Sequence, residues 1–196
     1  MKKLPIVLFV LTISLISFKA IESVTYKAVI AESELTWEGS RPGKTHNGTL
    51  GIKEGSLVFE DGKLASGDFT LNMTNITVLD IKPGKNNQKL VDHLNTPDFF
   101  DSKNYPTGKF MISGSQEKNG KTLVKGKLTI KGITKDVSFL ATISNNGDTV
   151  ILKSDKFNID RTDWDIRFRS GKFFDNLKNK LIYDDLPITV NVTAKK

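Results

Sequence analysis

The chain contains few side chains that could perform chemistry, and histidine and cysteine are the scarcest. His46 and His93 are its only histidines, and it has no cysteine. Zinc sites built from several His or Cys ligands and thiol catalysis are therefore not expected, and no metal or cofactor is predicted. His93 lies beside Leu94 in a stretch with helical spacing, which indicates a structural role. His46 lies in THNGT, where contact with the polar head of a ligand is the alternative to a structural role.

Acidic residues gather in two places towards the C-terminus. These are Asp160, Asp163 and Asp165 in the first place, and Asp184 with Asp185 in the second. Two carboxylates that converge on a pocket could act as general acid and general base, so a hydrolase is one hypothesis. The spacing gives no sign of such convergence. It favours turn residues instead, with Asp160 and Arg161 forming an ion pair at the end of a strand.

Two adjacent phenylalanines followed by aspartate occur twice, at 99–101 and at 173–175. Each pair follows or flanks a stretch with helical spacing. If both stretches lie at one end of a barrel, one ring of each pair would point inward and its neighbour would cover the adjacent loop. Asp101 and Asp175 would then accept backbone N–H bonds in the turns. The rings would either fill a core or gate a cavity, and both interpretations remain open.

The elements that must position these residues are mainly strands, because polar and apolar residues alternate along most of the chain. In residues 121–131, KTLVKGKLTIK, the lysines share one parity while Val124, Leu128 and Ile130 share the other, as in a strand with one buried face. The same alternation gives four more inward sets: Phe69, Leu71 and Met73; Phe110 and Ile112; Val137, Phe139, Ala141 and Ile143; and Ile188, Val190 and Val192. Less regular strands are predicted near residues 35–37, 49–59 and 149–159.

Turns and helices complete the predicted fold. The pairs Asp61-Gly62, Asn119-Gly120, Lys131-Gly132 and Asn146-Gly147 suit hairpin or loop positions with positive φ. Residues 87–94 and 174–181 have helical spacing. We therefore predict a mainly β protein, an antiparallel up-and-down, lipocalin-like barrel of about eight strands with two short helical insertions, because closure hides the strand edges. A barrel of this size is either filled by side chains or holds one small ligand.

The N-terminus predicts export. Lys2 and Lys3 precede an apolar run that ends at Phe18 and is followed by the small residues Ala20 and Ser23. This order is typical of a cleaved signal peptide, with an uncleaved anchor as the alternative, and the run of about 15 residues is shorter than a membrane-spanning helix needs. We predict a signal peptide over residues 1–23, a single domain over residues 24–196, and a periplasmic or secreted location.

Charge and composition restrict the partners. The chain has 29 Lys and Arg against 22 Asp and Glu, a formal net charge of +7. Such an excess indicates ordinary solubility, with weak contact with an anionic membrane surface as the alternative. The lysines are spread along the chain and do not cluster with aromatic residues, so no nucleic-acid partner is expected. The oligomeric state stays open.

Five separate stretches carry a combined pattern. They are THNGTLG (45–51), HLNTPDFFDSKNYPTGKF (93–110), VKGKLTIKGITKDVSF (124–139), FNIDRTDW (157–164) and FFDNLKNKLIYDDLPITVNV (173–192). In this order they resemble the YceI family of bacterial secreted lipid-binding proteins, from about Leu35 to the C-terminus. The resemblance implies a lipocalin-like barrel whose elongated apolar cavity holds a polyisoprenoid or another long-chain amphiphile.

This resemblance, together with the parity of the strands, defines a candidate site. The cavity-lining set is Trp37, Phe69, Leu71, Met73, Leu90, Leu94, Phe99, Phe100, Phe110, Ile112, Leu128, Ile130, Phe139, Ile143, Phe173 and Phe174. The stretch DIRFRSGKF (165–173) is more charged than the family pattern leads us to expect. Its Arg167 and Arg169, together with His46, are candidates for head-group contact. The leading hypothesis is a non-enzymatic carrier that sequesters a long apolar chain. The alternatives are the hydrolase and a filled barrel with no ligand.

Overall fold

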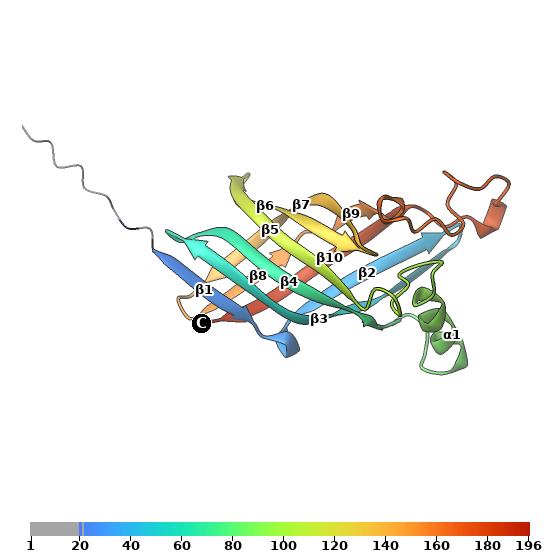
Figure 1. The fold of residues 1–196 in the computed structure, drawn as a ribbon, viewed down its shortest axis with the longest axis horizontal. Coiled ribbons are helices and arrows are strands. Elements are labelled where there is room, and N and C mark those ends of the chain that lie inside the picture. Colours follow the sequence, from blue (N-terminus) through green and yellow to red (C-terminus); the bar gives the residue numbers. More distant parts are fainter. Residues whose placement is uncertain (1–19, 21) are drawn as a thin grey trace, which may run out of the picture.

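The fold is a closed antiparallel β-barrel that carries one α-helix in the part of the chain described (Figure 1). The computed structural model describes Ala20 and residues 22–196, so most of the predicted signal peptide lies outside the described residues. The strands are β1 (Ser23–Ala28), β2 (Glu34–Arg41), β3 (Lys44–Glu60), β4 (Lys63–Ile76), β5 (Thr107–Lys118), β6 (Lys121–Ile130), β7 (Ile133–Asn145), β8 (Thr149–Ser154), β9 (Phe157–Asp160) and β10 (Asp185–Lys195). The predicted mainly β, antiparallel barrel is confirmed.

Ten strands occupy eight positions in the ring. β1 and β2 share the position between β3 and β10, because β1 pairs with the last residues of β3 and β2 with its first residues. A 3₁₀ turn, η1 (Ile30–Glu32), separates β1 from β2. β8 and β9 share the position between β7 and β10, each paired with a different part of β10. The sequence pattern predicted about eight strands, which equals the number of positions in the ring. It missed β1 and the breaks that separate β1 from β2 and β8 from β9.

One stretch of the wall lacks a backbone ladder. β8 pairs with Ala141–Asn145 of β7, but within the described chain no strand pairing joins residues 133–139 of β7 to β9. Phe139 of β7 instead stacks on Phe157 of β9, with ring centroids 4.6 Å apart and an interplanar angle of 15°. Side chains close the barrel at this place.

Three predicted hairpin turns have the expected left-handed backbone. Both residues have positive φ in Asp61-Gly62, Asn119-Gly120 and Lys131-Gly132. Two successive residues with positive φ match the twist of the strands that they join. These turns fix the register and with it the face on which each side chain lies.

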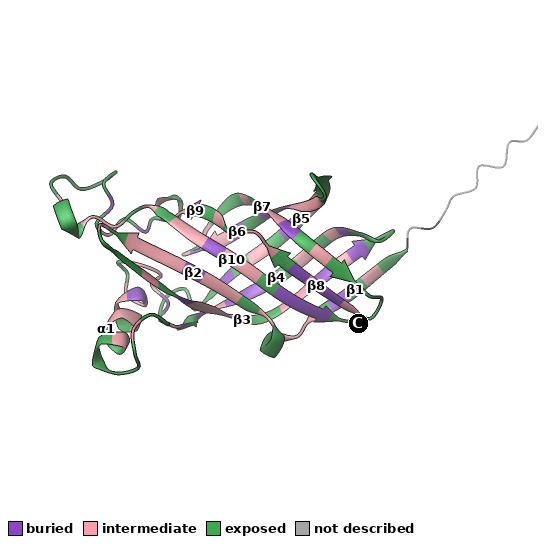
Figure 2. Cartoon of the chain, turned by 180° about the vertical axis from the view of Figure 1, so that it is seen from behind, coloured by how far each residue is buried: buried purple, intermediate pink, exposed green. Residues whose placement is uncertain are grey.

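Burial follows the predicted parity. On β6, Val124, Leu128 and Ile130 are at most 9% exposed, while Lys125 and Lys127 between them are exposed. On the other long strands the residues of the predicted inward sets are buried or half-buried (Figure 2). The barrel interior is therefore built from the predicted apolar faces.

Of the two predicted helices, only the first forms. α1 (Lys85–Leu94) contains the predicted residues 87–94 and follows Gly84. The prediction for residues 174–181 was wrong, because this segment holds only turns and the 3₁₀ turn η3 (Lys178–Lys180). Asn176 and Lys178 have φ of 57° and 48°, and a left-handed residue interrupts a right-handed helix. Among residues 20 and 22–196, none of the helices has the length and hydrophobicity of a transmembrane span.

The two ends of the barrel differ. The turn end carries the hairpin turns at residues 61–62, 119–120 and 146–147 together with both termini of the barrel. Buried residues fill the turn end and are here called the plug. They include Leu57, Phe59, Leu64, Val124, Ala141, Val150 and Ala194. The loop end carries residues 77–84, α1, residues 95–106 and residues 161–184, which include the 3₁₀ turn η2 (Arg161–Trp164) (Figure 1).

Candidate functional site

The candidate site is an apolar cavity inside the barrel. The volume open to the centre of a water-sized sphere is about 90 Å³. Its 22 lining residues are all apolar; Phe100 comes from the loop after α1, and the others come from every strand but β1: Leu35, Trp37, Leu50, Ile52, Phe69, Leu71, Met73, Ile76, Phe100, Phe110, Ile112, Leu128, Ile130, Val137, Phe139, Leu152, Phe157, Ile159, Leu186, Ile188, Val190 and Val192. The buried residues of the turn end do not line it, so the cavity runs from this plug towards the loop end.

Glycines in the wall accommodate three of the aromatic rings. Trp37 pairs with Gly48 across β2 and β3, and Phe69 pairs with Gly55 across β3 and β4. A Cβ added at Gly48 would lie 2.7 Å from the indole ring, and one added at Gly55 would lie 2.2 Å from the Phe69 ring. At Gly126 an added Cβ would lie 2.7 Å from the ring of Phe110. The rings therefore lie flat against the wall, which keeps the centre of the barrel open.

The structure places ten of the sixteen predicted lining residues at the cavity. They are Trp37, Phe69, Leu71, Met73, Phe100, Phe110, Ile112, Leu128, Ile130 and Phe139. The other twelve lining residues were not in the predicted set. Several of them, such as Val137 and Val190, belong to the inward sets that the alternation predicted, although the candidate site did not include them. Whether any of these residues binds a ligand stays a prediction.

Six predicted lining residues lie elsewhere. Leu90 and Leu94 of α1 and Ile143 of β7 pack in or against the hydrophobic core without facing the cavity. Phe99, Phe173 and Phe174 belong to the loop end. At these six positions the sequence pattern indicated a buried residue or one near the loop end. Such a pattern cannot show whether the side chain also faces the cavity.

The two FFD motifs differ in structure. Phe100 lines the cavity, while Phe99 packs in an aromatic cluster with His93 and Phe168, whose ring centroids lie 5.0 and 5.5 Å from it. This division matches the prediction for the first pair. The prediction for the second pair was wrong, because Phe173 and Phe174 are 44% and 49% exposed and neither ring turns inward.

The aspartate of the first motif also differs from its prediction. The Asp101 carboxylate accepts from the side chain of Asn104, at 3.0 and 3.1 Å, and not from a backbone N–H. Its backbone carbonyl accepts the N–H bonds of Asn104 and Tyr105 instead. The backbone carbonyl of Asp101 therefore stabilises the turn, and its carboxylate accepts hydrogen bonds from the side chain of Asn104.

None of the three head-group candidates lines the cavity. His46 Nδ1 lies 2.8 Å from Asp80 Oδ2, and the Asn47 N–H donates to the other carboxylate oxygen at 3.0 Å. Burial opposes ionisation of Asp80, but these two partners outweigh it and lower the pKa of the carboxyl. Arg167 pairs with Asp165, and the guanidinium of Arg169 lies 4.9 Å from the Phe168 ring centroid.

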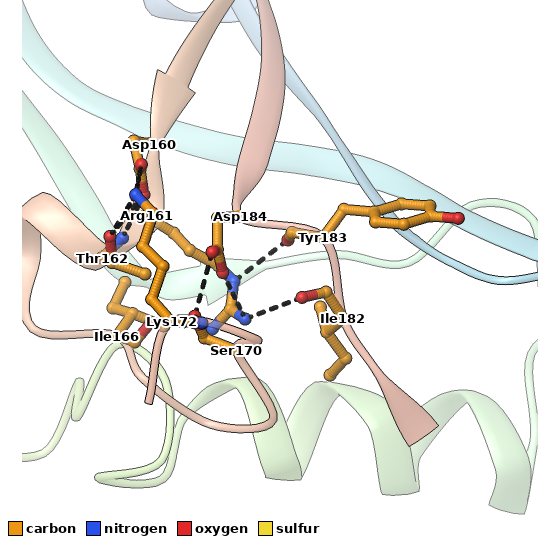
Figure 3. A network of polar contacts seen from close by, with 9 residues as sticks. All are labelled: Asp160, Arg161, Thr162, Ile166, Ser170, Lys172, Ile182, Tyr183 and Asp184. Atoms are coloured by element: carbon orange, nitrogen blue, oxygen red, sulfur yellow. Dashed lines mark hydrogen bonds and ion pairs between the residues drawn. The ribbon is translucent and has the colours of Figure 1, made fainter. Parts of the chain in front are cut away.

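Asp160 and Asp184, one from each of the two acidic groups, make polar contacts within the loops (Figure 3). Asp160 accepts from the backbone and hydroxyl of Thr162, at 2.9 and 2.6 Å, and pairs with Lys172. Burial opposes ionisation of Asp160, but these donors prevail and its pKa is lowered. The carboxylates of the two predicted clusters are absent from the cavity lining, and the described residues contain no cluster of three or more His, Asp or Glu suited to a metal ion.

Arg161 holds the loop end together. It is 3% exposed and donates to the carbonyls of Ile166, Ile182 and Tyr183, at 2.7, 3.1 and 3.1 Å (Figure 3). Its Nη2 lies 3.1 Å from Asp184 Oδ1, so the predicted pair with Asp160 was wrong. Burial lowers the pKa of Arg161, and the nearby carboxylates oppose this effect. The segment between β9 and β10 is thereby fastened to a buried cation.

Curated relatives match only part of the chain. A UPF0312 protein of Photorhabdus laumondii is 29% identical over 100 residues, which cover 51% of this chain and 50% of that protein. One from Pseudomonas putida is 28% identical over 102 residues, covering 52% and 50%. The alignments thus span about half the length of these relatives.

Solved structures and a family model match more of it. BcnA of Burkholderia cenocepacia has a TM-score of 0.66 and 23% identity, over 86% of this chain and 99% of its own. A polyisoprenoid binding domain from Saccharophagus degradans has a TM-score of 0.64 and 9% identity, over 87% and 97%. At these identities the likeness concerns the fold. The model of the YceI-like domain matches residues 26–194, and the chain therefore belongs to the YceI-like family.

Proposed function

We propose that this protein binds a lipid with a long apolar chain inside its barrel and acts as a carrier. The observation that supports this most is the cavity wall, in which all 22 residues are apolar. Such a wall cannot pair with a charged or hydrogen-bonding ligand, but it gains free energy when it removes hydrocarbon from water. The family, and the polyisoprenoid named for the Saccharophagus domain, support a lipid as the ligand class.

The cavity runs from the turn end towards the loop end, and its lining is apolar throughout, which suits the tail of one lipid. Each methylene group buried there would contribute about 0.8 kcal/mol before the costs of association. A polyisoprenoid or fatty-acyl tail would lie along the barrel, with its end against the plug and its head towards the loop end.

A binding role is favoured over the hydrolase. Asp160 and Asp184 hold loops through Lys172, Thr162 and Arg161. Neither lines the cavity, where a scissile bond of a bound lipid tail would lie. The carrier needs only the apolar wall.

A chain-length series tests the proposal. Straight-chain carboxylic acids of increasing length would compete with a fluorescent fatty acid, and we expect about fourfold tighter binding per added methylene until the cavity is full. Alcohols of equal length should bind within a few-fold of the acids. Equal affinity at every length would contradict the proposal.

A pair of variants locates the binding. Leu128→Asn places an amide in the cavity wall, whereas Lys127→Asn places the same amide on the outer face of the same strand. We expect weaker binding only for Leu128→Asn, in protein whose circular dichroism matches the native spectrum. Equal binding by both variants would place the ligand elsewhere.

We also propose that the carrier works in the periplasm or outside the cell, on the basis of the apolar run that follows Lys2 and Lys3. Mass spectrometry of the N-terminal peptide from separated cell fractions tests this. We expect a peptide that starts near residue 24, in the periplasm or medium. Uncleaved protein confined to the cytoplasm would contradict it.

A further inference from the structure

The loop end of the barrel carries an unusual surface on residues 165–183, here called the basic loop. It follows η2 and ends before Asp184, the residue that precedes β10, and it projects from the same end of the barrel as α1 (Figures 1 and 2). Phe173, Phe174 and Tyr183 on it are 44%, 49% and 47% exposed. Three large hydrophobic residues on one short segment require an explanation, because exposed apolar groups gathered in one place mark contact surfaces.

Most of the exposed large hydrophobic residues lie at this end of the molecule. Seven large hydrophobic residues of the described chain are exposed, and Leu79 and Tyr105 also belong to loop-end segments. Only Ile30 and Met111 lie elsewhere. The apolar surface is therefore concentrated around the end of the barrel towards which the cavity runs.

The charge of the basic loop is also one-sided. It contains Arg167, Arg169, Lys172, Lys178 and Lys180 against Asp165 and Asp175, a formal net charge of +3. Arg167 pairs with Asp165 and Lys172 pairs with Asp160 outside the loop, while Asp184, the next residue, pairs with the buried Arg161. The turn end has mixed charges, with four acidic residues (Glu60, Asp61, Glu117 and Asp148) and three basic residues (Lys63, Lys118 and Lys121) in and beside its three hairpin turns. Among the described residues, Lys178 and Lys180 have no ion-pair partner within 4 Å. These two ammonium groups are available to an outside partner.

The basic loop is fastened to the barrel and presented outward. The buried Arg161 binds the carbonyls of Ile182 and Tyr183 at its C-terminal end, and Arg41 Nη1 donates to Asn179 at 3.3 Å. The Arg167 guanidinium lies 4.7 Å from the centre of the Phe173 ring. Cation–π contact of this kind holds an aromatic ring beside a charge at the surface.

We infer that the basic loop is a docking surface for an anionic lipid bilayer. Aromatic rings lie favourably at the boundary between headgroups and acyl chains, and lysine and arginine side chains reach anionic headgroups from there. The charge excess matches a membrane with a negative surface potential. The surface would hold the loop end of the cavity against the bilayer that supplies or receives the lipid. The inference goes beyond the proposed function, since docking needs no ligand in the cavity.

Vesicle co-sedimentation tests the inference with residues 20–196, which contain every element of the fold and exclude the apolar run at 4–18. We expect binding to vesicles of phosphatidylcholine that contain about 30 mol% phosphatidylglycerol, and weak binding to vesicles of phosphatidylcholine alone. Binding should fall as salt rises, because salt screens exposed charges. Equal binding to both vesicles at all salt concentrations would overturn the inference.

Matched variants separate the loop from the rest of the surface. Phe173→Ser with Phe174→Ser should weaken vesicle binding at least tenfold, whereas Met111→Ser, on the barrel wall, should leave it unchanged. Lys178→Gln with Lys180→Gln should weaken it roughly fivefold per lysine. Lys109→Gln with Lys153→Gln removes the same charge from the wall and should have a much smaller effect.

Three results would overturn the inference: native binding by the double phenylalanine variant, equal losses in the wall controls, or self-association through Phe173 and Phe174 without vesicle binding. Displacement of a fluorescent fatty acid in solution, measured on the same variants, should stay at the native level. That readout reports on the cavity alone, so failure of docking and failure of the proposed lipid binding would be distinguishable.

Discussion

Replacing Gly55 by alanine should narrow the cavity through the ring of Phe69. The added Cβ would stand 2.2 Å from Phe69 Cδ1, and ordinary contact begins at 3.4 Å, so the ring must move by at least 1.2 Å. The three nearest atoms to this Cβ all belong to the Phe69 ring, and Gly55 does not have positive φ. The backbone therefore accepts alanine, and the ring is displaced from the wall towards the centre of the barrel.

Two consequences of Gly55→Ala can be measured. Overpacking of this size should lower the free energy of unfolding by about 1–3 kcal/mol in urea titrations. If the displaced ring excludes two methylene groups of a bound chain, the affinity for the longest fatty acids should fall by about 1.6 kcal/mol, roughly 15-fold, while the shortest acids bind as before. The competition assay with the chain-length series reads this directly.

Two controls accompany Gly55→Ala. In Gly39→Ala the nearest atom to the added Cβ is Cζ3 of Trp37, at 3.7 Å, so binding and stability should stay close to native. Gly55→Ala combined with Phe69→Leu removes the displaced ring and should recover the affinity for long chains. Native length dependence in the single variant would refute the view that the wall glycines keep the cavity open.

Three further predictions concern stability. Phe139→Ala should lower the free energy of unfolding by about 3–5 kcal/mol and Phe174→Ala by about 0.5 kcal/mol or less; equal losses in urea titrations would show that Phe174 is not at the surface. Arg161→Met removes the ion-pair partner of Asp184 and a donor to three carbonyls, and it should cost about 3–5 kcal/mol, against about 0.5 kcal/mol or less for Arg169→Met; similar costs would contradict the anchoring role. Because the folded-state pKa of Asp160 is lowered, its stabilising contribution is present above about pH 3.9 and is lost as the pH falls through the folded pKa. Asp160→Asn should therefore lose less melting temperature than the native protein between pH 5 and pH 2, and a parallel loss would refute this.

Local patterns were sufficient for most of the barrel. The alternation in residues 121–131 and the hairpin pairs such as Asn119-Gly120 specify faces and turns within a few residues, so β5, β6 and β7 could be predicted without tertiary information. β1 is short, and its place depends on pairing with the far end of β3, which no local pattern encodes.

Features of the site that depend on tertiary contacts escaped prediction. The two FFD motifs are identical in sequence, yet one follows α1 and inserts Phe100 while the other lies on the projecting basic loop. The helical spacing of residues 174–181 did not reveal the left-handed backbone at Asn176 and Lys178. The contact of Gly55 with Phe69 requires the register of β3 against β4, which includes irregularities. Residue types alone cannot distinguish such a glycine from one in a turn.

Native mass spectrometry of the protein, isolated from its own host without detergent, tests the central claim most directly. We expect a population heavier than the bare chain by the mass of one lipid, which organic extraction removes and which fragments as a long apolar chain. Gly55→Ala, isolated in the same way, should carry less of it. Contradiction would come from a protein that carries no such molecule and also fails to take up added long-chain lipids saturably.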